Sequence, residues 1–418
     1  MNFVDFVHFV DFVYFIKVAR KRANFFWCTI MTDQALTENS LKRRIKKYLP
    51  RENMQLFIPC PLNLAKVATE ELISKGITKE IKATDDGLEL IGDWKTIYQC
   101  NLHSSIGTRV LLRIGEFYVG SYPELFQKLK RIHWEVYFGF QKHFDVKISA
   151  KESRLHHTDN MKETFSEAVT LKMKDFDRAV TYKEGAVPCF YLRFYQDRCT
   201  VSLDTTGDNL YKRGYKQYAG EAPIRENLAA GMIKLVSKDN LLFVDPLCGG
   251  GTFGFEFLLD RLQIPTGSYR HFSFEQFPYF QQVSWEKLKL LNVKHNEKIK
   301  VYLNDRSAEC IAGVLKTATH LGLEQYIVTK AEDMTKFLKE MRFSEPYLMI
   351  TNIPYGKRIA LDKEDLLKDF LAFCRNRKQD GPYGFVAMKS QIVKNKVGLN
   401  QQILIKNGGL NTIFCFKE

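Results

Sequence analysis

The hydrophobic pattern between residues 54 and 212 predicts small units that mix strands and helices. Short apolar runs alternate with segments such as residues 62–76, whose apolar positions have helical spacing. Strands are expected at 54–60, on both sides of the turn 85–87, and at 108–117, 144–153, 187–195 and 198–204, with helices at 94–103, within 121–140 and at 161–177. One helix for every one or two strands indicates an α+β region rather than a large parallel sheet.

From residue 213 onward the pattern changes to a more regular alternation. A helical segment at 222–237 precedes an apolar strand at 241–245, a glycine-rich loop and a second helix at 253–262. Later strands are expected at 300–305, 325–333, 347–352, 384–388 and 411–416, with helices in several of the gaps. Alternating strands and helices over about 200 residues predict a doubly wound α/β domain.

The first 53 residues fit neither pattern. Phe recurs at every third position from 3 to 15, a period that matches neither a helix nor a strand. Three interpretations stay open for residues 3–16: an unstructured or fortuitously translated leader with the true start at Met31 or Met54, a membrane-surface or partner-binding segment, and a spanning anchor. The run is shorter than the roughly 20 residues that cross a bilayer. Residues 33–53 are polar and basic, and we expect a linker with or without a short helix.

Composition narrows the class of protein. The 418 residues are 45% hydrophobic and 26% charged, which excludes wholesale disorder and a disulfide scaffold. Lys and Arg number 62 against 48 Asp and Glu, and this +14 surplus favours a polyanionic partner without demonstrating one. The nine cysteines form no C-x-x-C pair, so no metal site is expected. Reduced thiols in the cytoplasm are the simplest interpretation.

A glycine-rich loop follows the strand at 241–245. In VDPLCGGGTFGFE, Asp245 ends the strand and Gly249, Gly250 and Gly251 let the backbone approach a ligand closely. The spacing departs from the dinucleotide fingerprint, and the Lys-Ser/Thr of a phosphate-binding loop is missing, so NAD and ATP fit poorly. A ligand with an amino acid and a ribose fits better, and a merely tight turn is the alternative.

Two more acidic residues end the next predicted strands. Asp305 could accept hydrogen bonds from ribose hydroxyls, and Asp333 could accept one from an adenine amine. Each one alone is more readily explained as a helix N-cap. Three acids after three successive strands nevertheless favour a nucleoside site at the carboxyl edge of the sheet.

The strand at 347–352 leads into Asn352-Ile353-Pro354-Tyr355. The Asn352 Oδ1 atom and the Ile353 carbonyl could accept both hydrogens of an exocyclic amine, while Tyr355 could stack on the base. Pro354 excludes regular structure just after the strand. The alternative is a strand-to-loop turn fastened by a buried Tyr.

These motifs resemble a known family. DPLCGGGT followed by NIPYG is similar to motifs I and IV of class I S-adenosylmethionine-dependent amino-methyltransferases, whose usual form is (D/N)PP(Y/F). Segments 97–117, 203–233 and 407–410 resemble THUMP-containing RNA guanine-N2 methyltransferases, closest to the bacterial enzymes that act on 23S rRNA. The resemblance covers residues 54–418. The chain departs from the family at Ile353, where Pro is usual, and at Gly250, where Ser is common.

The resemblance implies a fold and a domain order. We expect an N-terminal extension and basic linker (1–53), a ferredoxin-like plus THUMP RNA-binding region (54–212), and a Rossmann-like methyltransferase domain (213–418). It implies S-adenosyl-L-methionine as the cofactor, bound by Asp245, Pro246, Cys248, Gly249, Gly251, Thr252, Asp305, Asp333 and Asn352. It implies that the target amine is held by catalytic residues Asn352, Ile353, Pro354 and Tyr355.

An RNA partner, ribosomal RNA above all, gives the basic residues a role. The expected contacts combine Lys and Arg with Tyr that could stack on bases, namely Lys212, Arg213, Tyr215, Lys216, Lys357 and Arg358. A solvated surface is the alternative for each. We expect a cytoplasmic monomer without metal and without a membrane contact, apart from one through residues 3–16. Alternative functions are a tRNA guanine-N2 methyltransferase, an RNA-binding protein with a degenerate methyltransferase domain, and an adenine-N6 DNA methyltransferase.

Overall fold

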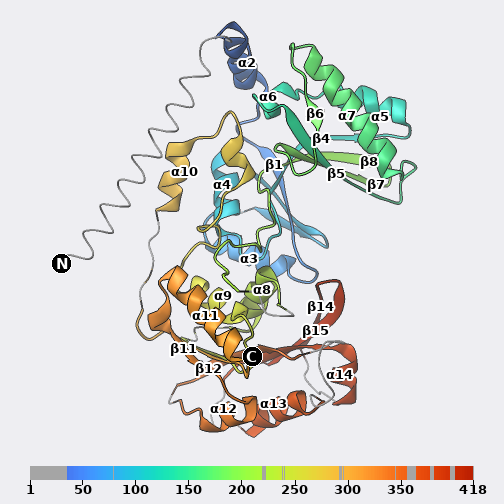
Figure 1. The fold of residues 1–418 in the computed structure, drawn as a ribbon. Coiled ribbons are helices and arrows are strands. Elements are labelled where there is room, and N and C mark those ends of the chain that lie inside the picture. Colours follow the sequence, from blue (N-terminus) through green and yellow to red (C-terminus); the bar gives the residue numbers. More distant parts are fainter. Residues whose placement is uncertain are drawn as a thin grey trace, which may run out of the picture.

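Two β-sheets organise the part of the chain that the computed structural model describes (Figure 1). The described residues are 35–78, 80–218, 223–237, 239, 241–290, 294, 296–343, 345–354, 364–376, 381–395 and 401–417. The leader at 3–16 and the predicted site residues Tyr355, Lys357 and Arg358 lie outside them.

The first unit has the β-α-β-β-α-β order of a ferredoxin-like fold. Its elements are β1 (Met54–Pro59), α3 (Ala65–Ser74), β2 (Ile81–Thr84), β3 (Gly87–Gly92), α4 (Trp94–His103) and β4 (Leu111–Tyr118). The strands pair in the antiparallel order β2-β3-β1-β4. Asp93 caps α4, because its carboxylate accepts a 2.7 Å hydrogen bond from the Thr96 amide.

A second α+β unit extends the same sheet. It contains α5 (Tyr122–Leu129), α6 (Glu135–Phe138), β5 (His143–Lys151), α7 (Thr158–Lys174), β6 (Thr181–Tyr182), β7 (Cys189–Tyr195) and β8 (Arg198–Asp204). Strand β4 pairs with β8, so all eight strands run in one order, β2-β3-β1-β4-β8-β7-β5-β6. Helices α5 and α7 pack against each other on one side of this sheet (Figure 1). The buried Trp134 makes edge contacts with Phe165 and Phe190 beneath them.

The segment expected as a linker contains a longer helix than the sequence indicated. Helix α2 (Ala35–Tyr48) packs against α6. Leu41 and Leu49 are buried there. The helix is therefore docked on the second unit instead of forming an extended connection.

The C-terminal half forms the doubly wound domain that the sequence predicted. Its elements are α8 (Glu226–Val236), β9 (Leu242–Asp245), α9 (Thr252–Arg261), β10 (Lys300–Asn304), α11 (Ala308–Leu321), β11 (Ile327–Lys330), α12 (Met334–Glu340), β12 (Tyr347–Asn352), α13 (Glu364–Asn376), β13 (Tyr383–Met388), α14 (Lys389–Lys394), β14 (Gln401–Asn407) and β15 (Leu410–Lys417). The sheet order is β11-β10-β9-β12-β13-β15-β14. In this order the first five strands, from β11 through β10, β9 and β12 to β13, are parallel, and β15 and β14 add an antiparallel hairpin. The sequence did not predict β14.

The strand order reverses beside β9. The chain proceeds outward from β9 to β10 and β11, then returns to the other side of β9 with β12. In open α/β sheets, a ligand crevice forms outside the carboxyl ends of strands at such a reversal. The topology therefore places the site at the ends of β9, β10, β11 and β12.

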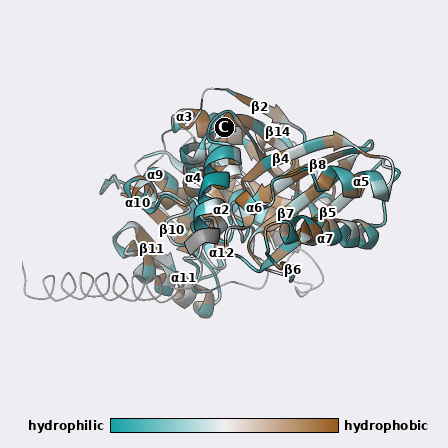
Figure 2. Ribbon diagram, turned by 90° about the horizontal axis from the view of Figure 1, so that it is seen from above, coloured by the Kyte–Doolittle hydropathy of each residue, from teal (hydrophilic) through white to brown (hydrophobic). Residues whose placement is uncertain are grey.

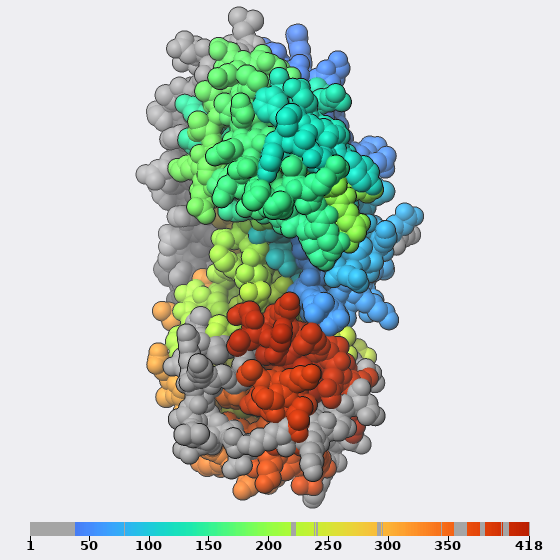
Figure 3. Space-filling model, turned by 90° about the vertical axis from the view of Figure 1, so that its right-hand side faces the viewer, coloured from blue at the N-terminus to red at the C-terminus, as the bar shows by residue number. Residues whose placement is uncertain are grey.

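An insertion between α9 and β10 connects this domain to the first unit. It contains a 3₁₀ helix (Ser273–Gln276) and α10 (Gln282–Lys289). The rings of Phe274 and Trp285 pack around Tyr98 of α4. In Figure 3 the second unit (green) and the C-terminal strands (red) lie at opposite ends, with the first unit (blue) and the segment after β8 (yellow-green) between them.

The described residues contain neither a candidate membrane span nor a candidate metal site. None of their helices is long and apolar enough to cross a membrane. No group of three or more His, Cys, Asp or Glu among them could hold a metal ion.

Candidate functional site

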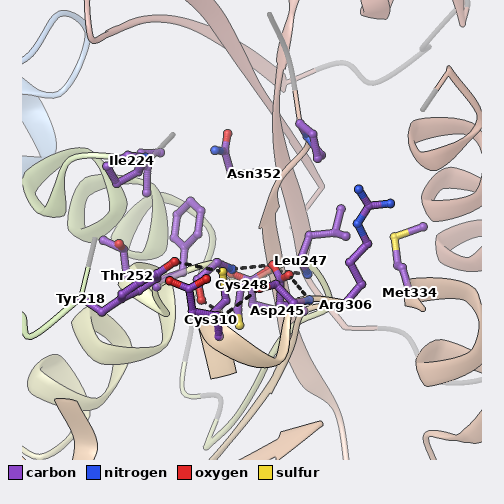
Figure 4. A pocket seen from close by; sticks show the side chains of 18 of the residues that line it. Tyr218, Ile224, Asp245, Leu247, Cys248, Thr252, Arg306, Cys310, Met334 and Asn352 are labelled. Carbon is purple, nitrogen blue, oxygen red and sulfur yellow. Dashed lines mark hydrogen bonds between the residues drawn. The ribbon is translucent and has the colours of Figure 1, made fainter. Parts of the chain in front are cut away.

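A cavity of about 370 Å³ lies at the carboxyl ends of the central strands, within the usual size range of ligand pockets. Seven of the predicted cofactor-binding residues line it, namely Asp245, Cys248, Gly249, Thr252, Asp305, Asp333 and Asn352. Pro246 and Gly251 belong to the same loop but are not among the residues that line the cavity. Figure 4 shows Asp245 and Cys248 on one side of the cavity and Asn352 across from them.

Asp245 is a buried acid at the end of β9. Its Oδ1 atom accepts hydrogen bonds of 2.7 Å from the Thr351 hydroxyl and 3.1 Å from the Leu247 amide. Burial, with a smaller contribution from the nearby charge of Asp305, raises the pKa of this carboxyl to about 7, although the hydrogen bonds from Thr351 and Leu247 act in the opposite direction. The site therefore contains a carboxyl group whose charge a cationic ligand would stabilise.

The glycine loop is fixed onto the next strand. The Gly249 amide donates a 3.0 Å hydrogen bond to Asp305 Oδ2, and the Ser307 amide donates one of 2.9 Å to Oδ1. Gly251 starts α9 with a φ of +75°, and a Cβ atom there would lie 3.0 Å from the Phe255 ring. Only glycine meets both conditions without strain.

Asn304 is a site residue that the sequence analysis missed. It ends β10 and is fully buried. Its Nδ2 atom donates hydrogen bonds of 3.1 Å to the Pro246 carbonyl and 3.0 Å to the Glu332 carbonyl, and its Oδ1 atom accepts one of 3.1 Å from the Glu332 amide. One amide side chain thus joins the loops after β9, β10 and β11. An Asn just before a strand-end Asp was the only signal, and it is a weak one.

Asp333 lines the cavity, but its carboxylate is used by its own helix. Its Oδ1 atom accepts a 2.8 Å hydrogen bond from the Thr335 amide as the N-cap of α12. Hydrogen bonds from Thr335 lower the pKa of the exposed Asp333 carboxyl. This carboxylate therefore serves as a helix N-cap, which was the alternative interpretation. A contact with an adenine amine stays a prediction. The buried Met334 adds an apolar surface beside it.

The loop after β12 is held by backbone hydrogen bonds. The Ile353 amide donates to the Val386 carbonyl at 3.0 Å, and the Pro354 carbonyl accepts from Gln391 Nε2 at 3.1 Å. The Ile353 side chain is fully buried. A Pro at this position would lack the donor, so Ile353 replaces the rigidity of Pro with a hydrogen bond to β13. Asn352 and Pro354 line the cavity.

The RNA-contact prediction is wrong for Arg213 and Tyr215, because neither reaches the surface. Arg213 is 2% exposed and Tyr215 is 0% exposed. The guanidinium of Arg213 forms a bidentate pair with Glu256 of α9 at 3.1 and 3.0 Å, and its Nη2 atom donates a 2.6 Å hydrogen bond to the Ser105 carbonyl. The Tyr215 hydroxyl donates to Glu256 Oε1 at 3.1 Å. These residues join the first unit to the C-terminal domain.

The two lysines of the same segment differ from each other. Lys216 is directed inward, where its Nζ atom donates to Glu226 at 2.9 Å and to the Thr252 hydroxyl at 2.8 Å. Lys216 therefore braces the first residue of α9. Lys212 is exposed and pairs with Asp208 at 2.7 Å. An RNA contact by Lys212 stays a prediction.

Comparisons with known proteins agree with this geometry. Residues 213–395 match the family described as "RMKL-like, methyltransferase domain", and residues 55–111 match the "RlmL ferredoxin-like domain". A protein of Psychromonas ingrahamii named "Ribosomal RNA large subunit methyltransferase K/L" is 31% identical over 316 residues, which are 73% of this chain and 42% of that protein. A Synechocystis sp. protein, slr0064, named as a candidate RNA methyltransferase, is 28% identical over 83% of this chain and 92% of its own.

Solved structures share the architecture of nearly the whole chain. A possible methylase from Clostridium difficile 630 has a TM-score of 0.76 and 27% identity, covering 87% of this chain and 98% of that one. SMU.472, described as a methyltransferase and solved in complex with SAH, has a TM-score of 0.75 at 24% identity, covering 88% and 98%.

The predicted family and fold class are thereby confirmed, although no matched family names a THUMP domain. The chain spans less than half the length of the K/L relatives. Residues 213–395 of this chain are thus a methyltransferase domain of the RMKL-like family, preceded by an RlmL ferredoxin-like domain at residues 55–111.

Proposed function

We propose that this protein transfers a methyl group from S-adenosyl-L-methionine to the exocyclic N2 amine of a guanosine in 23S rRNA. The observation that carries the proposal is that Asn352 lines the same cavity as the strand-end acids of β9 and β10. A donor of methyl groups and a planar amine acceptor could therefore meet in one pocket. The names of the K/L relatives support ribosomal RNA as the substrate.

The residues of the cavity fit the cofactor. The carboxylate of Asp305 suits ribose hydroxyls, the apolar Met334 suits the adenine ring, and the buried Asp245 suits the positive charge of the amino acid end. S-adenosylmethionine supplies a methyl group that is already activated on a sulfonium. The SAH bound to SMU.472 supports this cofactor for a chain of the same fold.

Orientation of the acceptor is the task of the loop after β12. A guanine amine is a poor nucleophile because its lone pair is delocalised into the ring. Hydrogen bonds to Asn352 Oδ1 and to the Ile353 carbonyl would hold the amine with its lone pair toward the methyl donor, and the proton then leaves to water. Positioning of this kind accounts for a large part of the rate. The target base must leave its stack to enter the cavity.

In this proposal, two parts of the chain have separate tasks. Residues 54–212 bind the RNA, and residues 213–418 bind the cofactor and transfer the methyl group. Every residue invoked comes from one chain, so a monomer suffices, and an enzyme that acts on ribosomal RNA is expected in the cytoplasm.

Substitution of Asn352 tests the mechanism. Asn352→Ala should still bind S-adenosylmethionine in calorimetry, because the other cavity residues remain, and it should lose about 100-fold or more in methyl transfer, because the amine is no longer oriented. Asn352→Asp keeps an acceptor oxygen and should retain more activity than Asn352→Ala. Wild-type turnover by Asn352→Ala would exclude the assigned role.

The acceptor is identified with unmodified nucleic acids. Ribosomal RNA, tRNA and DNA from a strain lacking the gene are incubated with labelled cofactor, and the product is mapped by nuclease digestion and mass spectrometry. N2-methylguanosine in 23S rRNA is expected. Label in tRNA or DNA would assign one of the alternative substrates, and RNA binding without any label would indicate a degenerate enzyme.

A further inference from the structure

Helix α2 carries a dense basic surface that the proposed site does not use. Four of its basic side chains are exposed, namely Lys42, Arg43, Lys46 and Lys47. Lys42 is paired only weakly, at 3.8 Å from Glu38. Within the part of the chain that the structure describes, no acidic side chain lies within ion-pair distance of the other three. The helix therefore presents uncompensated positive charge.

The opposite side of α2 is already occupied by packing. Leu41 and Leu49 are 7% and 8% exposed, and the Tyr48 ring stacks on His133 with centroids 3.9 Å apart. Arg44 donates hydrogen bonds of 2.9 and 2.7 Å to the fully buried Glu135. These contacts fix the helix on the second unit and remove Arg44 from the exposed set. Seen from above, α2 lies across the molecule with a largely hydrophilic surface (Figure 2).

The spacing of the four residues concentrates their charge. Positions 42 and 46, and likewise 43 and 47, are four residues apart and so are neighbours on a helix surface. From 42 to 47 the helix axis advances only about 7.5 Å. Four positive charges on so short a rigid segment match a polyphosphate backbone, whose counterions they would release.

We infer that this exposed face of α2 binds the phosphate backbone of the RNA substrate. The inference rests on the proposed function and adds an anchoring surface to it. Helix α2 lies at the end of the molecule opposite the methyltransferase sheet (Figure 1), so it contributes affinity and leaves the chemistry to the cavity. An anionic membrane is the weaker alternative, because a helix that binds at a bilayer surface needs a free apolar face, and Leu41, Ile45 and Tyr48 of α2 are engaged in packing.

Removal of the charge tests the anchor. Lys42→Gln, Arg43→Gln, Lys46→Gln and Lys47→Gln are combined in the full chain, since Gln keeps helix propensity. Binding to 23S rRNA fragments is measured by fluorescence anisotropy between 50 and 200 mM salt. The variant should bind on the order of tenfold or more weakly, and the slope of log affinity against log salt should become less steep by about 3. The turnover number with saturating RNA should not change.

The control exchanges the same positions without removing charge. Lys42→Arg, Arg43→Lys, Lys46→Arg and Lys47→Arg together should bind RNA like the wild type. Equal thermal unfolding of both variants and the wild type shows that α2 stays docked. A Gln variant with wild-type affinity and salt slope overturns the anchor, and methyl transfer by the wild type then leaves the proposed function standing. A wild type that neither binds nor methylates RNA overturns both. Loss of binding to phosphatidylserine vesicles with unchanged RNA binding assigns α2 to a membrane instead.

Discussion

The buried Asn304 offers a sharp test of how the cavity is built. Asn304→Ala removes the single side chain that joins three loops, and it leaves the Pro246 carbonyl and the Glu332 carbonyl and amide without this partner. Asn304 itself does not line the cavity, and of its two partners, both bound through backbone groups, only Glu332 does. Any effect on the cofactor must therefore act through the positions of the loops.

The magnitude follows from the three hydrogen bonds. Each contributes about 1 kcal/mol net, and a buried group left without a partner costs about 1 to 3 kcal/mol. We expect Asn304→Ala to lower the free energy of unfolding by about 3 kcal/mol. If binding of S-adenosylmethionine must restore the free energy of one of these hydrogen bonds, its affinity falls about fivefold. If binding must restore the free energy of all three, the affinity falls about 150-fold.

A second buried Asn provides the matched control. Asn101 of α4 is also fully buried and also makes three side-chain hydrogen bonds, to the Ile97 carbonyl and the Thr205 and Thr206 hydroxyls. Asn101→Ala should cost a similar free energy of unfolding in urea, because the lost bonds are equivalent. Its affinity for the cofactor, measured by calorimetry, should equal that of the wild type.

Two outcomes would refute this reasoning about Asn304. Wild-type cofactor affinity in Asn304→Ala would show that the loops keep their positions without the side chain. An equal loss of affinity in Asn101→Ala would show that affinity follows overall stability rather than the loops.

Three further predictions concern the buried charges and the glycine loop. Glu256→Gln should lower the free energy of unfolding by about 3 to 5 kcal/mol, because Arg213 stays buried without its counter-charge; a loss below about 1 kcal/mol in urea unfolding would contradict this. The pKa of Asp245 is raised to about 7 in the folded state, so the folded protein holds the proton more tightly, and its stability should fall as pH rises from about 4 to about 7. Asp245→Asn should lack this contribution when urea unfolding is followed at pH 5 and pH 8, and an unchanged pH dependence would argue against it. Gly251→Ala should destabilise the fold more than Gly322→Ala, because both have positive φ but only Gly251 has neighbours within 4 Å of the added Cβ. Only Gly251→Ala should weaken cofactor binding, and equal effects in thermal unfolding and calorimetry would count against the contact.

Much of the fold could be predicted from local pattern. The helix expected at 94–103 is α4, and the strands expected at 241–245 and 347–352 match β9 and β12 almost residue for residue. Elements held mainly by distant contacts were harder. The insertion whose Phe274 and Trp285 pack on Tyr98 was not predicted. For the insertion, the stabilising partner Tyr98 lies far outside any local window, so periodicity carries little signal for it. Strand β14 was also missed, although it forms a local hairpin with β15 across the turn at Gly408 and Gly409, so its signal does lie in the nearby sequence.

The candidate site could likewise be predicted only in part. The motifs identified Asp245, Asp305 and Asn352 because each ends a strand, and parallel strands bring their ends to one edge. The sequence offered a helix N-cap as the alternative role of Asp333, but it could not decide for that role. It could not reveal that Asn304 joins three loops either, because those contacts span up to 58 positions along the chain.

The sequence by itself determined most of the order of strands and helices, the edge of the sheet where the acids gather, and the family that the methyltransferase motifs resemble. Those features depend on spacing between near neighbours and on the chemistry of single side chains. Only the tertiary structure decided which basic residues face solvent. In the sequence, Arg213 and Lys46 are both basic residues in polar segments. In the structure, Arg213 is buried against Glu256, whereas Lys46 is exposed on α2. Burial depends on which distant element packs over a residue, and that is decided only when the sheets and helices assemble.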